Sequence, residues 1–95
     1  MFFYEVVILS SPLEKLTYHF NEEVKISCVV NVLLNNREKS AVIINICEKP
    51  SFKTLEILEV TNNFYSQNQL KFAKFISAYY VSSLGEALGI MTAHN

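Results

Sequence analysis

The longest regular pattern of apolar and polar positions lies between Ser66 and Gly89, in the run SQNQLKFAKFISAYYVSSLGEALG. Ser66 and Gln69 have the spacing of a capping box, in which two side chains satisfy early helical N–H groups. Apolar side chains recur beyond this start with the period of a helix, which predicts a helix with one face in the core. The predicted core face consists of Phe72, Phe75, Ile76 and Tyr79, flanked by Leu70, Ala73 and Tyr80.

The capping-box spacing occurs again at Ser83 and Glu86, which predicts a second short helix from Leu84 to Leu88. Gly89 is placed to end that helix. We expect a kink between the two helices, near Val81 to Ser83.

Two runs with the composition of β-strands lie near the N-terminus. Phe2 to Leu9 is rich in aromatic and branched residues and stops at Ser10-Ser11-Pro12, which predicts a strand followed by a turn. The period-2 pattern places Phe2, Tyr4, Val6 and Ile8 on the core face. Leu16 to Phe20 also alternates, and is interpreted as either a strand or an ordered loop.

The middle of the chain has the pattern of a β-hairpin. Lys25 to Leu34 and Ser40 to Cys47 are β-rich, and the polar residues 35–39 between them tolerate turn conformations. The second arm is almost continuously apolar, as expected for a central strand that is buried on both faces. A turn centred on Arg37-Glu38 would place Cys28 opposite Cys47, and we favour two buried free thiols over a disulfide. Thr54 to Val60 is expected to return to the sheet.

Strands that precede helices indicate an α+β fold. Two architectures fit: an OB-like, partly open barrel capped by the C-terminal helices, or a small open sheet with the helix on one face. Both would be mostly antiparallel. The 95 residues are enough for a single domain, 1–95.

The composition, with 51% hydrophobic and 18% charged residues, is that of a folded domain. A net charge of −1 does not suggest a protein that wraps nucleic acid through overall positive charge. The apolar runs are shorter than the roughly 18 residues of a membrane span, and none resembles a signal peptide. We therefore expect a soluble, cytoplasmic monomer without a membrane partner.

The sequence contains none of the motifs typical of catalytic sites. It lacks glycine-rich phosphate-binding loops, and the spacing of its Cys and His residues does not match a metal site. Cys28 and Cys47 lie within predicted strands, where inert thiols are more common than nucleophiles. We expect no enzyme activity and no cofactor in these residues.

Three groups of residues are candidates for binding. Asn35, Asn36 and Arg37 lie at the predicted hairpin tip, where backbone donors and a cation can meet a phosphate; a solvated turn is the alternative. Tyr18 could offer a ring on which a base stacks, but aromatic residues in a short chain belong to the core more often than not. Lys53 adds a further potential phosphate contact.

The order of these signals resembles the N-terminal 3′-DNA-binding domain of the primosomal replication-restart helicase PriA over essentially the whole chain. FFYEVVILSSPLEKLTY is similar to that domain's opening strand and Pro-Leu turn, and VNVLLNNREKSAVII is similar to its hairpin. KFISAYYVSSLGEALG resembles the family's helix ending in Tyr-Tyr, followed by Leu-Gly-Glu, and is the most specific of the three.

The resemblance implies a module that recognises the 3′ end of the nascent leading strand at a stalled replication fork. It implies a pocket formed by Leu16 and Thr17 after the Pro-Leu turn, the main chain at Asn35, and Lys53. Leu16 stands where the family has an aromatic residue, Thr17 where it has an acidic one, and Asn35 where it has glycine.

The resemblance also implies that the chain is the first domain of a longer ATP-dependent 3′–5′ DNA helicase. ATP, magnesium and zinc would then belong to the remainder of that protein. The implied partners are single-stranded or forked DNA with a 3′ end, other domains of the same chain and replication-restart proteins. The alternative function is a protein-interaction domain, which an exposed cluster of Tyr79, Tyr80 and Leu84 would favour.

Overall fold

The computed structural model describes residues 1–80 and 82–94, which form six strands followed by two helices. The strands are β1 (Phe2–Ile8), β2 (Leu16–Phe20), β3 (Cys28–Leu34), β4 (Arg37–Cys47), β5 (Leu55–Glu56) and β6 (Glu59–Phe64). The helices are α1 (Gln67–Tyr79) and α2 (Leu84–Gly89). This order confirms the α+β fold and makes Leu16–Phe20 a strand. Val81, at the predicted kink, lies outside the described residues.

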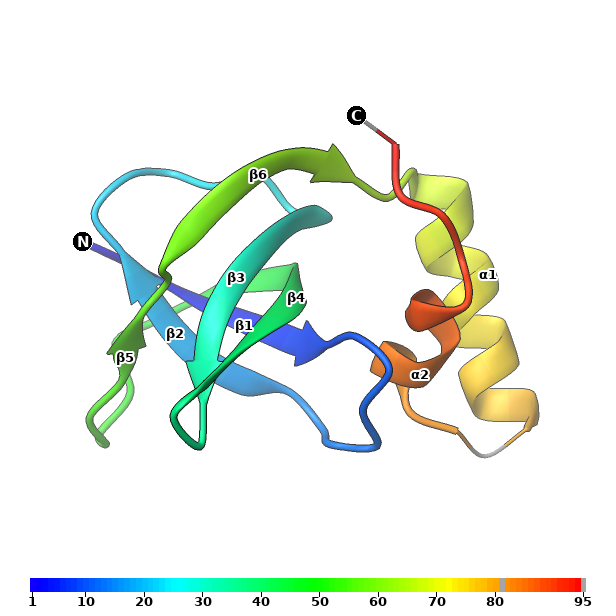
Figure 1. Ribbon diagram of the computed structural model, residues 1–95, viewed down its shortest axis with the longest axis horizontal. Helices are drawn as coiled ribbons and strands as arrows, with labels where there is room; N and C mark the ends of the chain where they lie inside the picture. The colour runs from blue at the N-terminus through cyan, green and yellow to red at the C-terminus, as the bar shows by residue number, and fades with distance from the viewer. Residues whose placement is uncertain (81, 95) are drawn as a thin grey trace.

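The strands form one sheet in the order β5-β2-β1-β4-β3-β6, and only the β2–β5 pair is parallel. The chain between β5 and β6 connects the two ends of this sheet. The Ile57 N–H donates to the His19 carbonyl of β2 at 2.9 Å, and the Leu58 N–H donates to the Asn31 carbonyl of β3 at 2.8 Å. The sheet therefore curls into a half-barrel, with the helices at one end (Figure 1). This is the OB-like architecture predicted from the sequence.

The half-barrel has an interior core and a second core beneath the helices. Tyr4, Val6 and Ile8 of β1 belong to the interior, as their alternation predicts, whereas Val7 faces the second core. The other buried interior residues are Tyr18, Val24, Val30, Val32, Ala41, Ile43 and Ile57. The second core adds Val29, Val42, Ile44, Tyr65, Ala73, Ala87 and Leu88.

β4 is buried on both faces along its middle. Residues 41–44 are all buried, which confirms the prediction of a central strand. Opposite β1 the strand bulges, because Val6 pairs with Ile43 while Glu5 pairs with Asn45. A bulge of this kind increases the local bend of a strand, as a closing barrel requires.

The prediction for the buried face of α1 was wrong. The helix starts at the predicted capping box, with Ser66 and Gln69 bonded reciprocally. It packs through the fully buried Ala73, with Leu70 and Ile76 partly buried, and leaves Phe72, Phe75 and Tyr79 exposed. Small side chains allow closer approach of a helix to its support than aromatic rings do. The aromatic stripe is the adjacent face of the same helix.

The hairpin turn lies two residues earlier than predicted. Asn35 and Asn36 alone form it, with φ of 52° and 65°, and Leu34 pairs with Arg37. Two positive φ values are the mark of the tight hairpin turn that Asn and Gly favour. With this register Cys47 does not lie opposite Cys28. Cys47 pairs instead with Phe3 of β1, and both thiols are free and half-buried.

Candidate functional site

Four of the residues predicted to bind line one hollow of about 270 Å³ at an end of the half-barrel: Leu16, Thr17, Tyr18 and Lys53. The hollow lies where β2 begins and where the loop before β5 passes, beside the tip of the β3–β4 hairpin (Figure 1). The remaining lining residues are Lys15, Leu34, Phe52, Thr54 and Leu55. The fold thus brings together segments that lie far apart in the sequence.

The loop that carries Lys53 is fixed against β2. Tyr18 pairs with Leu55 in the parallel β2–β5 ladder, and the His19 Nδ1 lies 2.6 Å from the Thr54 hydroxyl. The bond from the Ile57 N–H to the His19 carbonyl continues this attachment beyond β5. The loop before β5, which forms one wall of the hollow, is therefore held in place by hydrogen bonds to β2, which forms another.

Tyr18 is part of the core on its side of the hollow. Its side chain is 4% exposed, its hydroxyl donates to the Leu33 carbonyl at 2.7 Å, and burial raises its pKa. The ring is thereby occupied by core contacts, so its part in the hollow is that of a wall.

Phe52 supplies an accessible aromatic ring that sequence reasoning did not single out. It is 61% exposed and lines the hollow next to Lys53. The available signal was an aromatic residue in a loop, directly after the turn-forming Pro50-Ser51. An exposed aromatic ring of this kind can stack on a base.

The hairpin-tip residues Asn35, Asn36 and Arg37 are exposed and do not themselves line the hollow. Leu34, directly before the turn, does line it. The hairpin therefore contributes to the wall through the end of β3 and presents its two-residue turn at the margin.

The hollow contains two cationic side chains. Lys15 Nζ lies 3.9 Å from the Glu5 carboxylate, an exposed pair that contributes little to stability. Within residues 1–80 and 82–94, Lys53 makes no ion pair, so its ammonium group is open to an anion. This arrangement suits a ligand with a phosphate and an apolar ring.

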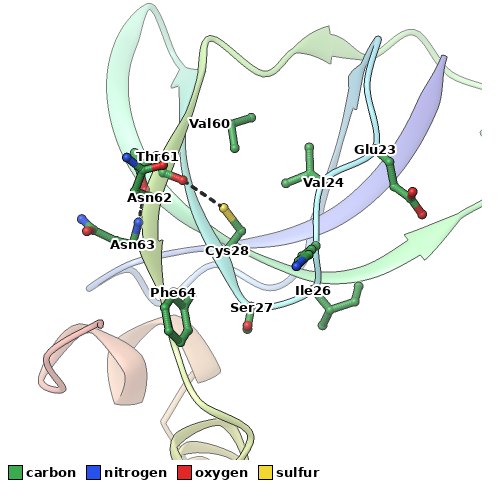
Figure 2. Close-up of a pocket in the computed structure, with 11 residues that line it drawn as sticks. Glu23, Val24, Ile26, Ser27, Cys28, Val60, Thr61, Asn62, Asn63 and Phe64 are labelled. Carbon is green, nitrogen blue, oxygen red and sulfur yellow. Dashed lines mark hydrogen bonds between the residues drawn. The ribbon is translucent and has the colours of Figure 1, made fainter. Parts of the chain in front are cut away.

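A larger groove of about 540 Å³ is lined by residues 23–28 and 60–64 (Figure 2). The Cys28 thiol lies between its walls and donates to the Thr61 carbonyl at 3.4 Å, and burial raises the pKa of that thiol. A raised pKa leaves little of the reactive thiolate at neutral pH. The charged residues of the groove, Glu23 and Lys25, oppose each other in sign. We favour the smaller hollow for an anionic ligand because two lysines line it.

In the part of the chain that the structure describes, no three His, Cys, Asp or Glu side chains are grouped as metal ligands. None of the described helices is long and apolar enough to cross a membrane.

Residues 5–93 match the model of a family described as the 3′ DNA-binding domain (3′BD). Two replication restart proteins PriA, from Helicobacter pylori strains 26695 and J99, are each 33% identical to the chain over 90 residues. Those alignments cover 95% of this chain but 14% of each relative, so the chain spans about one seventh of their length. The match over residues 5–93 confirms the resemblance read from the sequence, and the chain belongs to the family of PriA 3′ DNA-binding domains.

Proposed function

We propose that this chain binds the 3′ end of a single DNA strand in the hollow that contains Leu16, Thr17, Phe52 and Lys53. The main support for the proposal is that the start of β2 and the loop before β5 meet beside the hairpin tip. Membership of a family of DNA-binding domains supports DNA as the ligand.

The hollow has groups suited to each part of a terminal nucleotide. The exposed ring of Phe52 is available for stacking on the last base. It would replace the aromatic residue that the family has at the position of Leu16. Lys53 neutralises the adjacent phosphate. Thr17 offers a hydroxyl, and the main chain near Asn35 offers polar groups at the margin.

End recognition requires a closed, polar end-stop, because a groove open at both ends would also accept internal nucleotides. We assign this role to Thr17 and to the backbone of the Asn35-Asn36 turn. Both are expected to bond the terminal 3′ hydroxyl. Arg37, at the start of β4, is a second candidate for the phosphate.

The proposed setting is the restart of replication, after which the relatives are named. The 3′ end would be that of the nascent leading strand at a stalled fork. We assign no catalytic step to this chain; ATP-dependent unwinding, with its ATP, magnesium and zinc, would belong to other parts of a longer PriA protein.

Fluorescence anisotropy with a short single-stranded oligonucleotide tests this proposal. Two ligands are compared at fixed salt, one with a free 3′ hydroxyl and one with a 3′ phosphate. We expect tighter binding of the free hydroxyl, because the phosphate adds bulk and charge at the end-stop. Lys53→Ala and Phe52→Ala should each weaken that binding, the second by at least about fivefold, the lower end of base-stacking contributions.

Lys49→Ala is the matched control, because Lys49 is an exposed lysine of the same loop that does not line the hollow. It should leave binding nearly unchanged. Equal affinity for the two ends, or equal losses in the Lys49 and Lys53 variants, would contradict end recognition in this hollow.

A further inference from the structure

The solvent face of α1 and the residue that caps its C-terminus carry a cluster of exposed rings, here called the aromatic patch: Phe72, Phe75, Tyr79 and Tyr80. Their exposed fractions are 57%, 59%, 68% and 69%. Ring centroids lie 5.7 Å apart for Phe75 and Tyr79, and 5.0 Å apart for Tyr79 and Tyr80. Contiguous exposed apolar surface of this kind marks a binding surface more often than an ordinary solvent face.

The charge next to the aromatic patch is positive. Gln67–Tyr79 contains no Asp or Glu, and its charged residues are Lys71 and Lys74, both exposed. Lys71 is one helical turn before Phe75, which makes the two side chains neighbours. Both lysines also line a depression of about 250 Å³ between α1 and β4.

The surroundings of the patch differ from those of an apolar protein-docking site. Leu84, which the protein-interaction reading grouped with Tyr79 and Tyr80, is half-buried and packs against the second core. Lysine is depleted at the centre of protein interfaces, whereas cations beside stacked rings are the usual means of holding single-stranded nucleic acid. The combination of rings and lysines therefore favours a nucleic-acid strand.

We propose that the aromatic patch is a second contact surface for single-stranded DNA, on which unpaired bases stack while Lys71 and Lys74 contact the backbone. This inference rests on the proposed function, because both have single-stranded DNA as the ligand. α1 and the loop before β5 lie toward opposite ends of the molecule, whose longest extent is 34 Å (Figure 1). A strand held at both surfaces must be longer than one held in the hollow alone, toward the upper part of the ~4–16 nucleotide range of related folds.

Tyrosine fluorescence reports directly on this surface. The chain has five Tyr and no Trp. Tyr4, Tyr18 and Tyr65 are buried, and of these three Tyr18 lines the hollow. Quenching that the 16-mer causes beyond that of the 4-mer therefore reports on the exposed Tyr79 and Tyr80. The protein is titrated with a thymidine 16-mer and a thymidine 4-mer, both with free 3′ hydroxyls, and anisotropy is followed in parallel.

We expect the 16-mer to quench tyrosine fluorescence and to bind more tightly than the 4-mer. The double variant Tyr79→Leu, Tyr80→Leu keeps an apolar surface but removes two rings. It should lose the quenching and at least about fivefold of its affinity for the 16-mer, with 4-mer binding unchanged. Asn68→Ala, at an exposed position of the same helix outside the depression that Lys71 and Lys74 line, is the control and should change neither.

Two results would overturn the inference while leaving the proposed function intact. One is tight binding of both oligonucleotides without quenching. The other is unchanged DNA affinity in the double variant together with loss of self-association in sedimentation, which would make the patch a protein interface. Absence of binding by either oligonucleotide would reject both the inference and the proposed function.

Discussion

Phe52 and Tyr18 are aromatic residues of the same hollow, but their surroundings give them different roles. The Tyr18 ring is enclosed in the interior core and its hydroxyl is bonded to the Leu33 carbonyl. Phe52 keeps most of its surface in solvent, in a loop that β2 and β5 hold in place. Residue type alone does not separate these cases, because both side chains are aromatic and lie near lysines in sequence.

Burial of tyrosine hydroxyls makes the stability of the fold sensitive to alkaline pH. Burial raises the pKa of both Tyr18 and Tyr65, and the Tyr65 hydroxyl donates to the Leu88 carbonyl at 2.9 Å. Because the folded pKa lies above the unfolded value of about 10, the stabilisation is fully present below pH 10. It is lost as the pH rises from 10 through the folded pKa. Urea unfolding between pH 8 and pH 11.5 should record this decline.

Tyr65→Phe should cost about 0.5–1.5 kcal/mol at pH 8, since one buried hydrogen bond is lost. It should also show a smaller decline above pH 10 than the unsubstituted chain. Tyr80→Phe alters an exposed ring and is the control. An alkaline decline that is the same in all three proteins would rule out Tyr65 as its source.

At the scale of elements, the β3–β4 hairpin sets the position of the proposed end-stop. Asn35 and Asn36 both have positive φ, and the turn they form fixes Leu34 opposite Arg37. The binding groups near Asn35 belong to the main chain, so the geometry of this turn matters more than its side chains.

Replacing Asn36 tests the conformation of the turn. Asn36→Gly should leave the free energy of unfolding unchanged or raise it, because Asn-Gly is the favoured pair for this turn. Asn36→Val should lower it by about 1–2 kcal/mol, since a β-branched residue is strained at positive φ. Urea unfolding of the two variants checks this. If Asn36→Gly and Asn36→Val changed the free energy of unfolding equally, the positive φ at this position would not be a source of strain for a β-branched residue.

The elements themselves follow largely from local sequence signals, and the errors come from packing. Both capping boxes and the alternation of β1 predicted their elements, because these signals depend on neighbours within a few residues. The buried face of α1 could not be read from its period. Two adjacent stripes of the helix are apolar, and the choice between them depends on how closely Ala73 can approach its support.

The candidate site could also be predicted only in part, because some of its residues are brought together by contacts between distant segments. Leu16 and Thr17 came from the resemblance to a family, and Lys53 came from both that resemblance and its charge; the fold places the three around one hollow. Phe52 was missed because nothing local distinguishes a loop residue that faces a hollow from one that faces solvent. Its position depends on the pairing of β5 with β2, which joins segments distant in sequence.

At the scale of the whole molecule, the two surfaces that we propose bind DNA lie toward opposite ends, one beside β5 and the other on α1 (Figure 1). The hollow is small and contains two lysines, and the chain has a net charge of −1. Local contacts must therefore supply the attraction, because long-range electrostatics cannot.

The salt dependence of binding measures how many phosphates the hollow contacts. With two or three contacts, the slope of log K against log salt should be about −1.4 to −2.1 for a 4-mer, at about 0.7 per phosphate on a single strand. Anisotropy between 50 and 200 mM salt gives this slope. A value near zero would argue against phosphate contacts, and a much steeper one would indicate an extended electrostatic surface.

The most direct test of the central claim is to map amide chemical-shift changes in the ¹⁵N-labelled chain during titration with a thymidine 4-mer that has a free 3′ hydroxyl. We predict that the largest changes occur at Leu16, Thr17, Asn35 and Lys53, with small ones at the larger groove. Changes concentrated at residues 23–28 and 60–64 would contradict the account and assign the DNA to that groove.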